Sequence, residues 1–166
     1  MQPSAVYGNS PAAAMFEQMA AAPLLALPQG GGMAMQPVHV DDVVAGILAV
    51  LADPPAPGTT IAFVGPRPLS MAQYLRGLRQ AMGLRLPLPV LPLPTFVFLL
   101  GARLAAHVPG SILDAETAGM LLRGNAAPAD AFQRLLGRAP QGVETFIAPA
   151  DAPRLRARAL GPMKRI

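Results

Sequence analysis

The sequence contains no cysteine, no tryptophan and one lysine, and only 13% of its residues are charged. The absence of cysteine excludes disulfides, thiolate metal sites and a cysteine nucleophile, and it leaves the redox compartment open. With 52% apolar residues among 166, the composition is not that of a disordered chain, and the length suffices for one domain with a core. Twenty prolines and sixteen glycines predict short elements with many breaks.

No long apolar run free of charge and proline is present. Residues 86–106 are strongly apolar, but the uninterrupted part, Thr95 to Val108, contains Arg103 and is shorter than the roughly 20 apolar residues that span a bilayer. We therefore predict a buried helix after a proline-rich connector, with a peripheral membrane contact as the alternative. Nothing resembles a signal peptide, so we expect a cytoplasmic protein.

The net charge of +4 lies entirely in the C-terminal tail. Residues 1–150 carry eight basic and eight acidic side chains, whereas residues 151–166 carry five basic side chains and Asp151. A disordered, solvated tail over 149–166 is the expectation, and a contact with acidic lipid or RNA is the alternative. We expect no nucleic-acid partner for the neutral body of the chain.

The most informative stretch is Met35 to Asp53. Residues 36–40 alternate apolar and polar side chains, which predicts a half-buried strand. Asp41 and Asp42 are expected to cap a following helix and to favour its positive end. Apolar residues then recur at helical spacing, which predicts one broad buried face, at Val43, Val44, Ile47, Leu48, Val50 and Leu51.

Two further helices have clear starting residues. Ser10 precedes Pro11, which favours a helix N-terminus, and Ser70 stands three residues before Gln73 in the form of a capping box. In the second helix we expect Leu75, Leu78 and Met82 inside, and Arg76 and Arg79 in water. Residues 59–64 predict a strand, and residues 114–123 and 129–136 predict short helices.

Three segments in order resemble one family. They are Q-P-S-A-V-Y-G at residues 2–8, V-H-V-D-D-V-V-A-G-I at residues 38–47, and F-V-G-P at residues 63–66 followed by a helix. Together they resemble the extended and atypical short-chain dehydrogenases/reductases, the NAD(P)-binding epimerase/dehydratase group. Within this group, the segments are most similar to the atypical branch that includes complex I accessory-subunit-like proteins.

The resemblance covers roughly residues 2–147 and implies only the C-terminal half of such a protein. The implied fold is α/β, the C-terminal part of a Rossmann-like NAD(P)-binding fold with a small, mostly helical substrate-side region. We expect Rossmann-like strands and helices over 1–83, the substrate-side region over 84–148 and the basic tail over 149–166. NAD or NADP is the implied cofactor of the full-length family, and its binding by this chain alone is not expected.

The catalytic and cofactor motifs of that family are missing from the sequence. Its Tyr-x-x-x-Lys pair is absent, because Pro11 stands four residues after Tyr7 and Leu78 four after Tyr74. Gly30, Gly31 and Gly32 lead into a strand, whereas a phosphate-binding turn leads into a helix N-terminus. We therefore assign no catalytic residue and no metal ligand.

The resemblance places Pro3, Ser4 and Ala5 beside the nicotinamide as one wall of a cofactor site. Gln2 replaces the family's arginine and Ala5 its frequent asparagine, so a purely structural strand is the alternative. Met35 and Ala34 stand where members acting on nucleotide sugars often carry a phosphate-binding arginine, which disfavours such a substrate. His39 is interpreted as a locally hydrogen-bonded strand residue, since His39 and Asp41 alone are too few ligands for a metal.

Two functions remain open at this point. The first is the C-terminal portion of an NAD(P)-dependent oxidoreductase or epimerase-like protein, inactive alone and needing an upstream half or a protein partner. The second is a non-catalytic accessory or assembly module, using the apolar surface around Phe96 to Leu104 and the basic tail.

Overall fold

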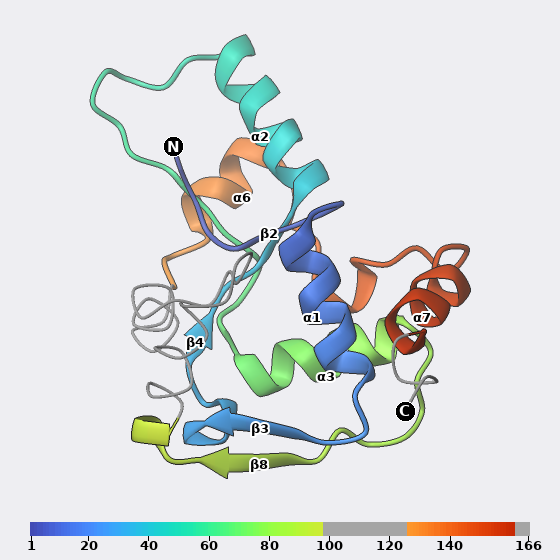
Figure 1. The fold of residues 1–166 in the computed structure, drawn as a ribbon. Coiled ribbons are helices and arrows are strands. Elements are labelled where there is room, and N and C mark those ends of the chain that lie inside the picture. Colours follow the sequence, from blue (N-terminus) through green and yellow to red (C-terminus); the bar gives the residue numbers. More distant parts are fainter. Residues whose placement is uncertain (98–125, 162–166) are drawn as a thin grey trace.

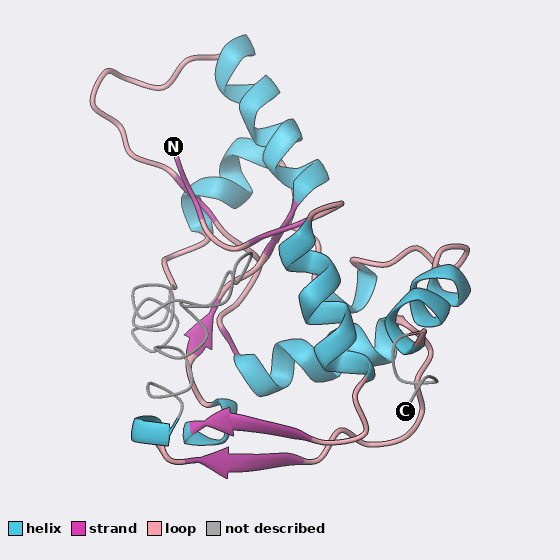
Figure 2. Cartoon of the chain, viewed as in Figure 1, coloured by secondary structure: helices cyan, strands magenta, loops and turns pink. Residues whose placement is uncertain are grey.

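The computed structural model describes residues 1–97 and 126–161 (Figure 1). The helices are α1 (Pro11–Ala21), α2 (Val40–Ala52), α3 (Met71–Ala81), α6 (Asp130–Leu136) and α7 (Ala152–Leu160), with 3-10 turns at Gln29–Gly31 and Val143–Thr145. The strands are β1 (Gln2–Pro3), β2 (Val6–Tyr7), β3 (Leu25–Pro28), β4 (Ala34–Met35), β5 (Val38–His39), β6 (Ala62–Phe63), β7 (Leu69–Ser70) and β8 (Val90–Leu93). Figure 2 shows this α/β mixture, which confirms the predicted fold class.

Parallel pairing dominates the strands. β1 pairs with β6, β2 with β5 and β3 with β8, all parallel, while β4 and β7 are antiparallel. The N-terminal segment links two of these pairs, because the Ser4 amide donates to the Phe63 carbonyl while the Ala5 carbonyl accepts from Val38. A parallel partner requires a long crossover connection, as in α/β folds.

The predicted helix starts are confirmed in detail. The Ser10 hydroxyl accepts from the Ala13 amide at 3.1 Å, and Pro11 occupies the first turn. At α3 the Ser70 hydroxyl accepts from the Gln73 amide at 3.1 Å, and the Gln73 side chain accepts from the Ser70 amide at 2.8 Å. Both devices satisfy amide groups that have no partner inside the helix.

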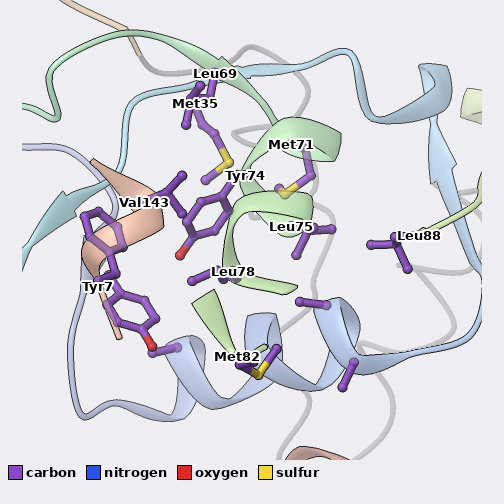
Figure 3. Close-up of a cluster of buried hydrophobic side chains, with 14 of the residues drawn as sticks. Tyr7, Met35, Leu69, Met71, Tyr74, Leu75, Leu78, Met82, Leu88 and Val143 are labelled. Atoms are coloured by element: carbon purple, nitrogen blue, oxygen red, sulfur yellow. The ribbon is translucent and has the colours of Figure 1, made fainter. Parts of the chain in front are cut away.

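The larger core lies where α3 packs against α1, β3 and the turn at Val143–Thr145. Figure 3 shows its side chains, and Leu75, Leu78 and Met82 are fully buried there, as predicted. Gly77 permits the close approach of α3 to Val143, since a Cβ at this position would lie 2.4 Å from the valine Cγ1. The expectation for Arg79 was wrong, because this side chain is 6% exposed rather than in water.

A smaller core joins α2 to α6 and β6. Phe63 and Phe132 stack there with ring centroids 4.4 Å apart, against Val43 and Val50 of α2. Gly46 permits this contact, because a Cβ would lie 2.7 Å from the Phe132 ring. This face of α2 is therefore partly buried, and of the apolar residues that the helical spacing indicated, Val43 and Val50 lie on it.

The opposite side of α2 departs from the predicted single buried face. Leu48 is 61% exposed and Leu51 72% exposed, and α2 projects from the body of the molecule in Figure 1. The exposed apolar side chains follow an i, i+4, i+7, i+8, i+11 spacing, which forms one stripe along a helix. We call this stripe the outer face of α2; it consists of Val40, Val44, Ile47, Leu48 and Leu51.

The basic tail also differs from the expectation of disorder. Ala152–Leu160 form α7, which packs against α1 and buries Ala159. Residues 95–97 are helical, as predicted. The rest of the helix predicted over 95–108, the helix over 114–123 and most of the surface from Phe96 to Leu104 lie outside the described residues. In residues 1–97 and 126–161 no helix has the length and apolarity needed to cross a bilayer.

Candidate functional site

A pocket of about 330 Å³ lies at the carboxyl ends of β2 and β5. Tyr7 and His39 are register partners at the ends of these parallel strands, and both side chains line the pocket. The helices that follow the two strands, α1 and α2, begin beside it. Ligands of parallel α/β sheets bind in crevices outside the carboxyl ends of the strands, so this is the site that the fold favours for binding.

Three aromatic rings form one wall of the pocket. Tyr7 stacks on Phe146 with centroids 5.0 Å apart, and His39 lies 5.9 Å from Tyr7 and 5.4 Å from Phe146. Phe146 follows the 3-10 turn at Val143–Thr145, more than a hundred residues from either partner. The wall therefore depends on the docking of a distant segment against the two strand ends.

A buried carboxylate organises the polar side of the pocket. Glu17 of α1 accepts from the Tyr7 hydroxyl at 2.9 Å and pairs with Arg158 of α7. The Glu17 side chain is nearly inaccessible, whereas Arg158 is half-exposed. A buried carboxylate is tolerated when both oxygens are paired, and here one is bonded to a phenol and the other to a guanidinium.

Tyr7 is held in its protonated form. Burial, followed by the hydrogen bond to Glu17, raises the pKa of Tyr7 above its ordinary value of 10.0. Proton exchange at neutral pH requires the opposite, a tyrosine whose pKa is lowered by a nearby cation. Tyr7 therefore donates a hydrogen bond that fixes Glu17, and its ring lines the pocket. Its raised pKa does not suit it to act as a general base.

We expect the free energy of unfolding to fall as the pH rises above about 10. Burial raises the pKa of Tyr7 and of Tyr74 in the folded state, so above the ordinary tyrosine pKa the unfolded chain releases protons that the folded chain retains. Urea unfolding at pH values from about 9 to about 11.5 should show a free energy of unfolding that is nearly constant at the lowest pH and then falls, with a slope that approaches about 1.4 kcal/mol per pH unit for each tyrosine above about pH 11. Tyr74→Phe should remove one such contribution; an unchanged slope in that variant would contradict the assignment.

His39 caps α2, and the prediction that an aspartate does so was wrong. The His39 Nδ1 accepts from the Asp41 amide at 3.3 Å, which confirms His39 as a locally hydrogen-bonded strand residue. Asp41 and Asp42 do lie in the first turn, where carboxylates favour the helix dipole. The imidazole replaces the carboxylate as acceptor because β5 ends at His39 and α2 begins at Val40, so the N-cap position falls two residues before Asp41.

Asp42 has a different role, which is to anchor a distant segment. It is fully buried, accepts from Arg138 Nη2 at 2.5 Å through Oδ1, and accepts from the Gln141 amide at 2.7 Å through Oδ2. Gln141 also lies 3.5 Å from His39 Nδ1 through its side chain. These bonds hold residues 138–141 beside the pocket. The same segment leads directly into the turn at Val143–Thr145, which Phe146 follows.

The residues expected to wall a cofactor site lie on the N-terminal strand segment. Pro3 and Ala5 are exposed, while Ser4 is buried with a hydroxyl that has no hydrogen-bond partner among the described residues. None of the three is among the residues that line the pocket at the ends of β2 and β5. Their assignment to a nicotinamide remains a prediction.

Sequence reasoning missed the pairing that shapes this pocket. Glu17 and Arg158 are 141 residues apart, and no local spacing connects an acidic residue of α1 with a basic residue of the tail. The one available indication is that Glu17 is the single charged residue of an otherwise uncharged helix. Within residues 1–97 and 126–161, no three His, Asp or Glu side chains are grouped to hold a metal ion.

Comparison with known proteins gives matches to solved structures alone. No family model matches the sequence, and no curated protein is similar to it in sequence. A nucleoside-diphosphate-sugar epimerase from Staphylococcus aureus superposes with a TM-score of 0.55 at 20% identity, over 80% of this chain and 44% of that one. UDP-glucuronic acid 4-epimerase from Bacillus cereus, solved with NAD, gives 0.53 at 18% identity, over 90% and 43%. RMD from Pseudomonas aeruginosa, complexed with NADPH, gives 0.52 at 12% identity, over 99% and 47%.

The chain has the Rossmann-like α/β fold of these three neighbours. Identities of 12–20% establish the fold alone. The chain spans less than half the length of each of the three neighbours. The epimerase-like fold is consistent with a pocket at the carboxyl ends of parallel strands, which is where the aromatic wall and Glu17 lie.

Proposed function

We propose that this chain forms the substrate-side, C-terminal part of an NAD(P)-dependent epimerase/dehydratase-like protein. A dinucleotide-binding part, on the same polypeptide or on another, would cover the outer face of α2. The chain by itself would have no turnover, because the sequence has neither the Tyr-x-x-x-Lys pair nor a glycine-rich turn between a strand and a helix. Tyr7, the tyrosine at the pocket, is held protonated and offers no substitute base.

The outer face of α2 is the observation that carries the proposal. Five large apolar side chains of one helix are exposed in a continuous stripe. Exposed stripes of this kind mark surfaces that another protein part covers. Each of β2, β5, β1 and β6 has one strand partner in residues 1–97 and 126–161, and unpaired edges of a parallel arrangement are likewise usually covered.

A second candidate is a non-catalytic accessory module of the complex I-like kind. The same outer face favours it, because an apolar helix face serves assembly as well as it serves the completion of an enzyme. The two candidates differ in the covering part: the first requires a dinucleotide-binding domain with a catalytic pair, and the second does not.

Calorimetric titration of the purified chain with NADH and with NADPH tests the absence of a dinucleotide site. The expected result is no binding in the micromolar range, since the sequence has no glycine-rich turn between a strand and a helix to hold a pyrophosphate. Micromolar binding would contradict the proposal, because this chain would then supply the dinucleotide site itself. The Glu17→Gln variant alters the pocket at the ends of β2 and β5. A loss of any weak binding heat in this variant would place that binding in the pocket.

A further inference from the structure

A second, larger pocket of about 890 Å³ lies beside the C-terminal end of α3. It shares no lining residue with the pocket at the ends of β2 and β5. Arg76 and Arg79 of α3 and Arg85 of the following segment line it, together with Gln80 and the apolar stretch from Leu84 to Pro89. No carboxylate is among the lining residues.

Arg79 is the fixed element of this pocket. Its Nε donates to the Leu86 carbonyl at 2.6 Å, and its Nη1 donates to the carbonyls of Ala20 and Ala22 at 2.7 and 2.9 Å. These bonds fix the guanidinium against the end of α1 and the pocket wall. The Arg79 side chain therefore loses little further conformational entropy when a ligand binds. Within the described residues, Nη2 makes no hydrogen bond, and its two N–H groups remain for a ligand or water.

The pocket holds positive charge without a protein counter-ion. Three arginines elsewhere in the described structure meet carboxylates: Arg67 with Glu144, Arg138 with Asp42 and Arg158 with Glu17. In residues 1–97 and 126–161, none of the three arginines of this pocket forms such a pair. Burial lowers the pKa of Arg79, which expresses the cost of a charge that no carboxylate offsets.

A fourth arginine stands at the rim. A Cβ on Gly83 would lie 3.7 Å from Nη1 of Arg156, which places this α7 side chain beside the turn that ends α3. Guanidinium groups match the geometry of phosphate oxygens through paired N–H donors. The neighbouring leucines and prolines offer an apolar wall, and the volume falls within the range of small-molecule sites.

We propose that this pocket binds an organic phosphate, with the phosphate against Arg76, Arg79 and Arg85 and an apolar or ring moiety against Leu84 to Pro89. The proposal is independent of the proposed function, because it concerns a different pocket and needs no dinucleotide-binding part. Both components of the ligand are required: the arginines supply the attraction for the anion, and the apolar wall distinguishes an organic phosphate from the free ion.

Titration of the whole chain with phenyl phosphate, inorganic phosphate and phenol tests the assignment. Phenyl phosphate is expected to bind in the millimolar range or tighter, about tenfold more tightly than inorganic phosphate, whereas phenol should not bind. The double variant Arg76→Gln with Arg85→Gln should weaken phenyl phosphate binding by at least tenfold, which is roughly the effect of losing one charged contact. Arg79 is left intact in this variant, because its bonds to three carbonyls also support the fold.

Arg134→Gln on α6 is the control, since it removes one positive charge from an exposed position away from the pocket. It should leave the phenyl phosphate affinity unchanged. Absence of phenyl phosphate binding in the wild-type chain, or equal weakening by the double variant and by the control, would overturn the proposal. A dinucleotide that bound through this pocket would lose its binding in the double variant, whereas one bound at the ends of β2 and β5 would keep it.

Discussion

Replacement of Gly65 by alanine is expected to lower the free energy of unfolding by about 3 kcal/mol or more. Gly65 follows β6, and a Cβ at this position would lie 2.2 Å from the backbone carbonyl oxygen of Pro37. A backbone atom cannot turn away as a side chain can, so the segment before β5 would have to move. That movement would strain the bond from the Gln36 side chain to the Gly65 carbonyl, now 2.8 Å, and with it the position of His39.

Urea unfolding followed by circular dichroism measures this change, and Gly58→Ala serves as its control. Gly58 lies in the exposed loop after α2 with φ +83°, and nothing approaches its Cβ position within 4 Å. The control should therefore lose only about 1 kcal/mol, from the left-handed backbone conformation. A loss below this value in Gly65→Ala would show that the two segments are not packed as described.

Gly65 and the helix caps are features that short stretches of the sequence predict. F-V-G-P at residues 63–66 resembles a family motif, and the close approach to Pro37 is the physical reason for a glycine at that point. The helix starts at Ser10 and Ser70 were predictable for a similar reason, since each cap involves residues within three positions of one another. Local hydrogen bonding of this kind is fully encoded in short stretches of sequence.

The side chains that shape the candidate site were predicted less well, because their partners are far away in the chain. Asp42 was expected to cap a helix, but it binds Arg138 and Gln141, which lie 96 and 99 residues later. Arg79 was expected in water, but it reaches carbonyls 57 and 59 residues earlier. Helical spacing places such residues on a face without stating what covers that face, and a charged residue is assigned to solvent by default.

The outer face of α2 shows the same limit in the opposite direction. The helical spacing of Val44, Leu48 and Leu51 predicts that they lie on a buried face, but in the structure these side chains are exposed. The prediction of an apolar helix face was correct, but the prediction that the chain's own core buries it was wrong. An apolar stripe that contacts a partner has the same sequence pattern as one that contacts the core of its own chain. This ambiguity makes the outer face the part of the account that most needs a direct test.

The account predicts that the purified chain self-associates through the outer face of α2. In the absence of the proposed covering part, burial of the five apolar side chains between copies is favourable by about 25 cal/mol per Å² of apolar surface. The double variant Leu48→Gln with Leu51→Gln removes the two most exposed members of the stripe. Because neither side chain lies in a buried cluster, the fold should be retained, with an unchanged circular dichroism spectrum.

Sedimentation velocity over a range of concentrations is the measurement that tests this most directly. The wild-type chain should sediment as concentration-dependent oligomers, and the α2 variant should sediment as a single chain. The matched control, Leu24→Gln with Leu91→Gln, changes two exposed leucines away from α2 and should associate as the wild type does. A wild-type chain that remains monomeric at all concentrations, or a control that dissociates as fully as the α2 variant, would contradict the claim that this face awaits a covering part.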